Sequence, residues 1–583
     1  MKAIFSLVTA FIQIFMFQMR TVLLVVFLLP VLMVTAHPAP GSSELVASLK
    51  SGQIRGEYVT VKGTERRVKR YLGIPFAKPP VGPLRFAAPE SPEPWEGERD
   101  GTQQPLMCIQ DREIVVNISI ALSMDFTVPE VSEDCLYLNI YTPAETTPEV
   151  KLPVMVWIHG GGLVMGAASQ YDGSSFTAYE NVVTVIIQYR LGILGFLSTG
   201  DEHAKGNWGL LDQLAALRWV QENIEAFGGD PQSVTIAGES AGGISASILT
   251  LSPLSKGLFH KAIFQSGVAT IGAYTSDQSL IQAHIVANLT GCYMSSTEEL
   301  VQCLRGKTQD EFISATKRSK IILGATVDGE FLPGTADVLL QRKEVLNIPV
   351  MMGVTNHEFG WILPQAFAPR GWDKGMNPGT VLGVVNLFNP KGAANAANAL
   401  IMAEYLKDTQ TLEDFRDAFT EVIGDLLMVL PTIKVAGYHT DAGAPVYMYE
   451  FVYVSDRPTS NRPSFVKADH ADDVGYMFGA CFWNGHIRIT VNCTDQDERF
   501  SRTMMSYWAS FVRTGSPNGP GLVNWPLYDR QKQEYMELGQ NQSVKQKLKK
   551  DKVDFVTAIL PQRLQQMEAA AAQWHGSQIS VDS

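Results

Sequence analysis

The chain has 583 residues, of which 45% are hydrophobic and 18% charged, and its mean hydropathy is close to zero. A chain of this length is too long for a single small hydrophobic core. The composition suits a globular protein built as one large domain with insertions. The formal net charge of −12 at pH 7 argues against partners such as nucleic acid or an anionic membrane surface, and it does not disfavour neutral or cationic small molecules.

Residues 1–36 are predicted to be a signal peptide. Arg20 precedes the apolar run 21–34, and residues 34–36 are small enough for a cleavage site. Translation starts at Met1 or at Met19, because residues 1–18 are also apolar. A retained membrane anchor is the alternative, but it would have to accommodate Arg20. The expected organisation is a signal at 1–36, one folded domain at 37–575 and a polar C-terminal tail at 576–583.

The six cysteines fit the oxidising compartment that a signal peptide implies. The expected disulfides are Cys108–Cys135, which encloses a moderate loop, and Cys292–Cys303, which encloses a tight one. The remaining two, Cys481 and Cys493, either form a third disulfide or stay as free thiols. Acceptor sequences for N-glycosylation begin at Asn117, Asn288, Asn492 and Asn541. Cys493 lies inside the third of these, which makes Asn492 the weakest acceptor.

Short strands with turns are expected from residue 54 to 141, where 136–141 alternates as an antiparallel strand does. The later strands are continuous apolar runs, which is typical of a parallel sheet covered on both faces: residues 154–158, 182–187, 234–237, 348–354 and 446–449. Helical segments such as 210–227 lie between them, and insertions at about 275–345 and 373–443 read as mostly helical. The predicted fold class is therefore α/β, with a mostly parallel, doubly wound sheet.

One of these strands ends in a serine flanked by small residues. After the run 234–237 come Gly238, Glu239, Ser240, Ala241 and Gly242. A turn sharp enough to lift a serine hydroxyl above the end of a strand needs residues without bulky Cβ groups two positions before and after it. The pattern predicts a nucleophile elbow. An ordinary strand-to-helix turn that contains serine is the alternative.

A nucleophilic serine needs groups that stabilise negative charge on the tetrahedral intermediate. The run 160–162, which follows the strand 154–158, consists of three glycines, and such a backbone can turn its N–H groups toward a ligand. We expect the donors to be Gly161, Gly162 and the N–H of Ala241. The alternative for the glycine run is a merely flexible loop.

The serine also needs a base and an acid, which in this fold class follow it in the order acid, then histidine. His470 lies on a loop after the strand 446–449 and is preferred over His486. Glu358 lies directly after the strand 348–354. It is preferred over Asp328 and Glu330, because no clear apolar strand precedes those two residues. His357 is not expected to pair with Glu358, because neighbours on an extended segment point to opposite sides.

With these residues in view, the chain resembles the type B carboxylesterases of the α/β-hydrolase superfamily, the vertebrate liver-type enzymes most of all. Residues 227–242 match the serine signature of that family and residues 133–140 match its second signature. The resemblance implies the α/β-hydrolase fold, the triad Ser240, Glu358 and His470, the oxyanion hole of Gly161, Gly162 and Ala241, and the two disulfides expected above. It implies ester hydrolysis through an acyl-enzyme, with small-molecule esters as partners and no metal or other cofactor.

Two departures refine this expectation. The chain ends at 578–583 without the His-x-Glu-Leu signal that returns such enzymes to the endoplasmic reticulum, so secretion is expected over retention in its lumen. The loop 108–135 contains no tryptophan, which disfavours the choline-ester activity of the related cholinesterases. A catalytically inactive, cholinesterase-like adhesion protein is the alternative function, and it is disfavoured by the complete triad. A lipase would use the same chemistry with a different pocket.

Overall fold

The structure is a computed structural model that describes residues 45–579 except 148, 277, 294, 319–321, 390–395 and 457–461. The predicted signal peptide at 1–36 lies outside the described residues. In the described part of the chain, no helix is long and apolar enough to cross a bilayer.

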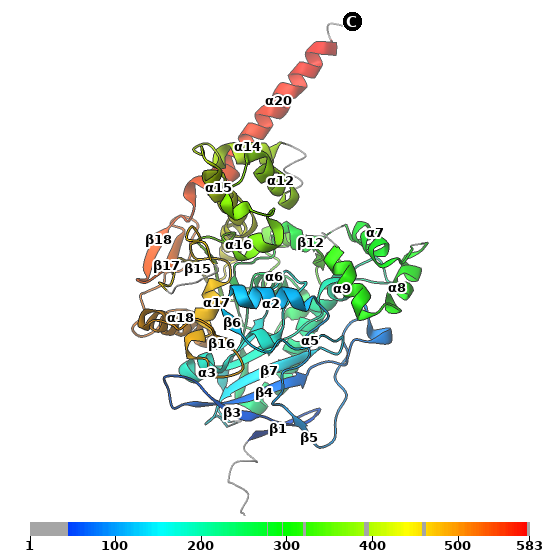
Figure 1. Ribbon diagram of the computed structural model, residues 1–583, viewed down its shortest axis with the longest axis vertical. Coiled ribbons are helices and arrows are strands. Elements are labelled where there is room, and N and C mark those ends of the chain that lie inside the picture. Colours follow the sequence, from blue (N-terminus) through cyan, green and yellow to red (C-terminus); the bar gives the residue numbers. More distant parts are fainter. Residues whose placement is uncertain are drawn as a thin grey trace, which may run out of the picture. The chain divides into compact units, whose positions relative to one another are not determined.

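A central sheet carries the architecture (Figure 1). Within the described residues it has eleven strands, which in spatial order are β18 (Ser543–Gln546), β17 (Glu534–Leu538), β15 (Val446–Phe451), β14 (Val350–Thr355), β11 (Lys261–Gln265), β10 (Gly229–Glu239), β8 (Leu152–Ile158), β9 (Val183–Ile187), β7 (Tyr137–Pro143), β4 (Arg67–Pro75) and β3 (Glu57–Thr60). The strands from β17 to β9 pair in parallel, and the pairs at both edges are antiparallel.

This arrangement confirms the predicted fold class. The five continuous apolar runs correspond to β8, β9, β10, β14 and β15, and the alternating run 136–141 lies in the antiparallel strand β7. Strands β11 and β17 were not expected from the sequence. In β11 the polar residues Lys261 and Gln265 stand at the two ends of a five-residue strand, so its apolar run is only three residues long.

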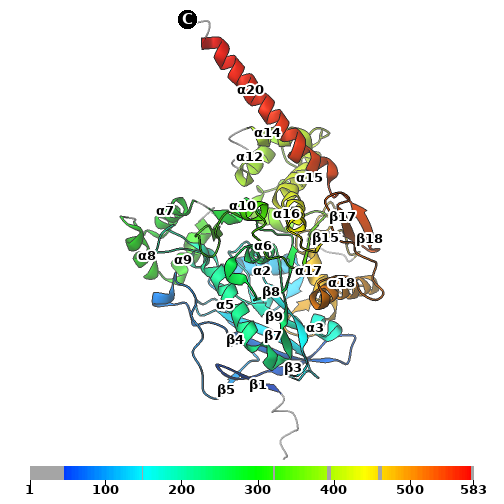
Figure 2. The same ribbon diagram turned by 180° about the vertical axis from the view of Figure 1, so that it is seen from behind.

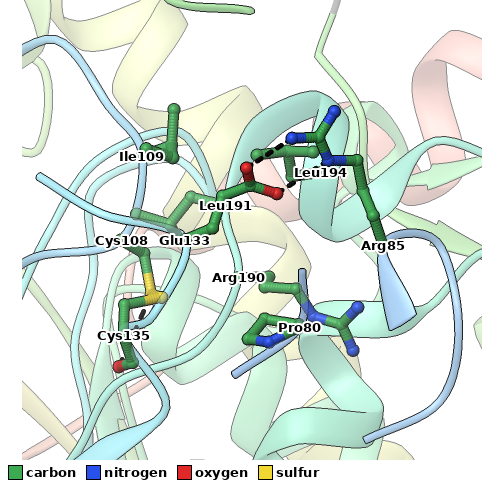
Figure 3. Close-up of a pocket in the computed structure, with 9 residues that line it drawn as sticks. All are labelled: Pro80, Arg85, Cys108, Ile109, Glu133, Cys135, Arg190, Leu191 and Leu194. Carbon is green, nitrogen blue, oxygen red and sulfur yellow. Dashed lines mark hydrogen bonds and ion pairs between the residues drawn. A yellow bond between two sulfur atoms is a disulfide. The ribbon is translucent and has the colours of Figure 1, made fainter. Parts of the chain in front are cut away.

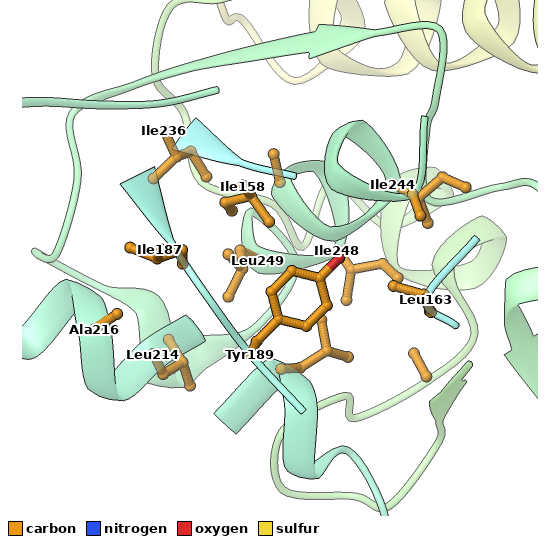
Figure 4. Close-up of a cluster of buried hydrophobic side chains, with 14 of the residues drawn as sticks. Ile158, Leu163, Ile187, Tyr189, Leu214, Ala216, Ile236, Ile244, Ile248 and Leu249 are labelled. Carbon is orange, nitrogen blue, oxygen red and sulfur yellow. The ribbon is translucent and has the colours of Figure 1, made fainter. Parts of the chain in front are cut away.

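The two faces of the sheet carry separate hydrophobic clusters, because successive strand residues point to opposite sides. On one face, Val156 and Ile158 of β8 pack with residues of α5 (Trp208–Asn223) and α6 (Ala241–Leu249). Figure 4 shows this cluster around Tyr189. On the other face, Met155 and Trp157 pack with residues of α3 (Ser174–Glu180) and α18 (Asp495–Thr514). The parallel strands are thus covered on both sides, as their apolar composition indicates.

The two long insertions are mostly helical, as predicted. The first contains α7 (Ser279–Thr290), α8 (Thr297–Arg305), α9 (Gln309–Arg318) and α10 (Ala336–Gln341), and the second contains α12 (Pro378–Phe388), α14 (Ala397–Tyr405), α15 (Leu412–Gly424) and α16 (Leu430–Asp441). Helices α7 to α9 gather in one group, and α12, α14 and α15 in another (Figure 2). The last described helix is α20 (Leu560–Ile579).

Candidate active site

Ser240 lies at the tight turn between strand β10 and helix α6. Its backbone has φ 55° and ψ −125°, a sparsely populated conformation that costs on the order of 1–3 kcal/mol and must be imposed by its surroundings. A Cβ atom on Gly238 would lie 2.4 Å from the carbonyl carbon of Gly242, and one on Gly242 would lie 2.0 Å from the carbonyl oxygen of Ile158. The strand and the helix can therefore meet at this angle only because both residues are glycine.

A third glycine supports the turn from the loop that follows the neighbouring strand β11. A Cβ atom on Gly267 would lie 2.1 Å from the carbonyl oxygen of Ser240, and the Ser240 N–H donates to the carbonyl of Gln265 at 2.8 Å. Sequence analysis missed Gly267, because its role depends on β11, which was not predicted. A Ser-Gly pair one residue after the apolar run 262–264 is the signal that could have found it.

His470, on the loop after β15, and Glu358, on the loop after β14, lie together. His470 Nδ1 is 2.6 Å from Glu358 Oε2, and the two residues are only 3% and 2% exposed. Glu358 Oε1 accepts two more hydrogen bonds of 2.6 Å, from the Thr355 N–H and from Ser266 Oγ. The carboxylate is thus held by three donors and fixes the orientation of the imidazole.

The loops that carry these two residues are joined directly. Asp469 accepts hydrogen bonds from the backbone N–H groups of Trp361 at 2.9 Å and Ile362 at 2.8 Å. A single parallel bridge also pairs His357 with Asp469. The backbone next to Glu358 is therefore bound to the backbone next to His470, although the two residues are 112 positions apart in the sequence.

A second carboxylate faces the other nitrogen of the imidazole. Glu239 Oε1 lies 3.0 Å from His470 Nε2, and Glu239 is 5% exposed. Burial alone would lower the pKa of His470, but the negative charges of Glu239 and Glu358 outweigh it and raise this pKa well above its usual value. The imidazolium form is therefore strongly stabilised.

The glycine run lies beside the serine in a backbone conformation that only glycine adopts without cost. Gly161 has φ 100° and Gly162 has φ 64°, and a Cβ atom on Gly161 would lie 2.3 Å from the carbonyl oxygen of Met165. Gly161, Gly162 and Ser240 all line the same cavity. Ala241 is the first residue of α6, where backbone N–H groups have no partner within the helix. Gly161 and Gly162 thus lie at the same cavity as Ser240, and Ala241 follows the serine directly in the chain.

His159 precedes the glycine run and supports it. Its ring is buried, stacks on Tyr189 at 4.4 Å, and places Nδ1 2.9 Å from the carbonyl oxygen of Gly160. Burial lowers the pKa of His159 to about 4, so the ring is neutral near pH 7. A Cβ atom on Gly166 would lie 2.1 Å from His159 Nδ1. This packing fixes the path of the backbone that leads to Gly161.

Ser240 and His470 open into a cavity of about 740 Å³, a volume that suits a drug-sized molecule. Much of its lining is apolar or aromatic, and includes Ile118, Tyr171, Ile271, Leu363, Phe367, Phe388, Met428 and Trp483. Arg462 and Asp472 also line it, and they form an ion pair with contacts of 2.6 and 2.7 Å. Since each of these charges faces its partner, the cavity is suited to a mainly apolar, uncharged ligand.

A buried acid behind the site was missed by sequence analysis. Asp473 Oδ2 accepts hydrogen bonds from the hydroxyl of Tyr449 at 2.7 Å and from Nε2 of Gln265 at 2.9 Å. Burial raises the pKa of Asp473 to about 7, and the negative charge of Glu239 adds to this rise. Asp473 follows His470 by three residues in the sequence, but nothing local indicates that its partners come from β11 and β15.

His486, the rival of His470, has another partner, and so does His357, the neighbour of Glu358. His486 Nε2 is 3.0 Å from the carbonyl oxygen of Ser169. His357 Nε2 is 2.9 Å from Thr420 Oγ1, which agrees with the expectation that its ring points away from Glu358.

The competing acids are also occupied by other partners. Asp328 accepts a hydrogen bond from Asn207 Nδ2 at 3.0 Å, and Glu330 forms an exposed ion pair with Lys205 at 3.2 Å. Of the three candidate acids, only Glu358 contacts His470 in the described structure.

Both expected disulfides are present, and so is the third, which the sequence had left open. The pairs are Cys108–Cys135, Cys292–Cys303 and Cys481–Cys493. Figure 3 shows the first of them beside the ion pair of Arg85 and Glu133, where Arg85 Nε is 2.7 Å from Glu133 Oε2. Arg85 also donates to the carbonyl oxygen of Leu304 on α8 at 3.0 Å. The pocket in Figure 3 has a volume of only about 10 Å³, enough for one water molecule, so it is not a substrate site.

The four expected glycosylation acceptors are all exposed: Asn117, Asn288, Asn492 and Asn541. Exposure is necessary for modification, and each of the four meets this requirement.

The sheet is mostly parallel, a serine lies on a strained strand-to-helix turn, and an acid and a histidine lie on later loops. These features together define an α/β hydrolase. Residues 43–556 match the model of the carboxylesterase family. The chain therefore belongs to the carboxylesterase family, as the two sequence signatures indicated, and it is a carboxylic ester hydrolase.

Several relatives are similar over most of their length. A medium-chain fatty acyl-CoA hydrolase precursor from Anas platyrhynchos is 48% identical over 510 residues, which cover 86% of this chain and 90% of that protein. An acylcarnitine hydrolase from Mus musculus and a cocaine esterase from Homo sapiens are each 45% identical, and each alignment covers 90% of this chain and 93% of the relative.

Proposed function

We propose that this carboxylesterase cleaves esters with Ser240 as nucleophile, His470 as general base and acid, and Glu358 as the group that orients the imidazole. The observation that carries the proposal is the strained turn of Ser240 in one cavity with His470, whose other nitrogen is bound to buried Glu358 at 2.6 Å. A serine hydroxyl is a weak nucleophile until an adjacent base activates it, and this pair supplies the base.

In the first half of the reaction, Ser240 Oγ attacks the ester carbonyl carbon and its proton passes to His470 Nε2. The carbonyl oxygen becomes negative and accepts hydrogen bonds from the N–H groups of Gly161, Gly162 and Ala241. His470 then gives the proton to the leaving alcohol, and the acyl group stays on Ser240. In the second half, His470 takes a proton from water, which attacks the acyl-enzyme. The bond between the acyl carbon and Ser240 Oγ then breaks, His470 returns the proton to Oγ, and the acid is released.

Glu239 adds a second negative charge to the imidazolium that forms in each half. Its position 3.0 Å from Nε2 supports this role, because the raised pKa of His470 reflects the same interaction. The stabilisation has a cost: at low pH the resting imidazole is already protonated and cannot accept the serine proton. The base form grows as the pH rises, so the activity is expected to rise with it.

The substrates we propose are uncharged or weakly charged esters with apolar groups, of xenobiotic or lipid origin. The cavity of about 740 Å³ with its largely apolar lining supports this class. The names of relatives that act on fatty acyl-CoA and acylcarnitine support an acyl chain as one of these groups. The net charge of −12 supports small molecules over nucleic acid as partners. An inactive adhesion protein is not favoured, because all three triad residues are present.

We propose that the mature protein works outside the cytosol, as a secreted enzyme or in the lumen of the endoplasmic reticulum. Three disulfides support an oxidising compartment. The exposed acceptor asparagines fit the same compartment, since glycans are added there.

The test is the Ser240→Ala variant with a panel of p-nitrophenyl esters. We expect turnover to fall by at least about a thousandfold, because removal of the nucleophile leaves only the binding and oxyanion contributions. The thermal unfolding curve of the variant shows whether its fold is intact. A folded variant that retained turnover would remove Ser240 from the mechanism.

A further inference from the structure

The third disulfide closes a segment that forms one wall of the reaction cavity. Cys481 and Cys493 are 12 positions apart and joined to each other; we call the stretch between them the 481–493 segment. Six of its residues line the cavity that Ser240 and His470 also line: Cys481, Trp483, Ile489, Thr490, Val491 and Cys493. Three of these, Trp483, Ile489 and Val491, are large and apolar. This wall therefore suits the hydrocarbon part of an ester.

The segment reaches across to an element near the start of the fold. Strand β16 (Arg488–Ile489) pairs antiparallel with β6 (Met124–Asp125), with Arg488 opposite Asp125. Met124, Asp125 and Ile118 of the preceding helix α2 (Arg112–Ala121) line the cavity as well. The β6–β16 pair thus joins two distant parts of the chain into one continuous wall.

A ladder of two residues per strand is too short to be stable without other support. The disulfide supplies this support at the ends of the 481–493 segment. A second anchor lies at its middle, where His486 Nε2 is 3.0 Å from the carbonyl oxygen of Ser169. Next to it, a Cβ atom on Gly485 would lie 2.3 Å from Oδ2 of buried Asp172, so the segment packs tightly against the body of the fold there.

We propose that the 481–493 segment selects esters by the length of their apolar group, and that the Cys481–Cys493 disulfide fixes its position by holding β16 against β6. This inference rests on the proposed function, because it assigns a wall to the cavity in which Ser240 reacts. The segment acts on substrate fit and takes no part in the bond-breaking steps. A change in the segment should therefore alter the ratio of kcat/KM for long esters to kcat/KM for short esters.

The first experiment compares wild type with the double variant Cys481→Ser/Cys493→Ser, which leaves no unpaired thiol. One ester series lengthens the acyl group and a second lengthens the alcohol, and active sites are counted by labelling with an organophosphate. Without the disulfide the 481–493 segment can move outward and make room for a longer apolar group. We therefore expect the ratio of kcat/KM for the longest ester to kcat/KM for the shortest to rise at least about fivefold in one series. A ratio that is unchanged or lower in both series would overturn the proposal.

The second experiment keeps the disulfide, so it does not depend on how well the double variant folds. Ile489→Trp adds volume on the cavity wall, and we expect it to lower the same ratio on the order of tenfold. Asn484→Ala is the matched control, because Asn484 is an exposed residue of the same segment that does not line the cavity.

Equal ratios in Ile489→Trp and Asn484→Ala would contradict the assignment of the wall. Failure of the proposed function gives a different result, because wild-type protein would then neither turn over esters nor take up the label on Ser240.

Discussion

Removing the hydroxyl of Ser266 tests how the triad acid is held. Ser266 Oγ donates to Glu358 Oε1 at 2.6 Å, in a site where both residues are buried. A hydrogen bond to a charged group contributes about 1.5–3 kcal/mol, and its loss leaves Glu358 with one donor fewer. We expect Ser266→Ala to lower the free energy of unfolding by about 2 kcal/mol. We expect kcat/KM to fall about 10- to 100-fold, because a carboxylate that shifts no longer orients His470 well.

A matched variant separates the hydrogen bond from the backbone. Ser266 has φ 49°, a left-handed conformation that costs a non-glycine residue about 1 kcal/mol and costs glycine almost nothing. Ser266→Gly should therefore be about 1 kcal/mol more stable than Ser266→Ala and equally impaired in activity.

Urea unfolding followed by fluorescence gives the stabilities, and hydrolysis of p-nitrophenyl acetate gives kcat/KM. Wild-type kcat/KM in a destabilised Ser266→Ala variant would refute the claim that this hydrogen bond orients the triad.

Two further predictions concern the charge and the backbone around the nucleophile. The charge of Glu239 is the largest of the effects that raise the pKa of His470. Glu239→Gln should therefore lower that pKa and move the acidic limb of the pH profile of kcat/KM to lower pH. An acidic limb that stays in place or moves to higher pH would contradict the ion pair between Glu239 and His470. Gly267→Ala places a Cβ atom 2.1 Å from the carbonyl oxygen of Ser240, so we expect a loss of about 1–3 kcal/mol of stability together with most of the activity. Normal turnover in that variant would show that the elbow tolerates the shift.

The features predicted from the sequence are those whose cause is local. The elbow could be predicted because the small residues at 238 and 242 stand next to Ser240 and their steric need is set by the turn itself. Glu358 could be chosen because it comes shortly after strand β14, and His470 because it lies on the loop that follows β15. The ends of parallel strands meet at one edge of a sheet.

The features that were missed depend on contacts between distant parts of the chain. Gly267 packs against the carbonyl oxygen of Ser240, and Gln265 donates a hydrogen bond to Asp473, which is 208 positions away. Neither pair has a sequence pattern of its own, since each depends on the position of β11 in the sheet. The third disulfide was left open for a similar reason, because the pairing of β16 with β6 is not visible in a two-residue strand.

The central claim is that Ser240 forms an acyl-enzyme, and a pre-steady-state burst tests it most directly. Purified protein mixed with p-nitrophenyl acetate should release one equivalent of p-nitrophenol before the steady state. Prior reaction with an organophosphate should abolish this burst and leave the label on Ser240, as peptide mapping by mass spectrometry would show. Folded protein that gives no burst, or that carries the label on another residue, would contradict the account.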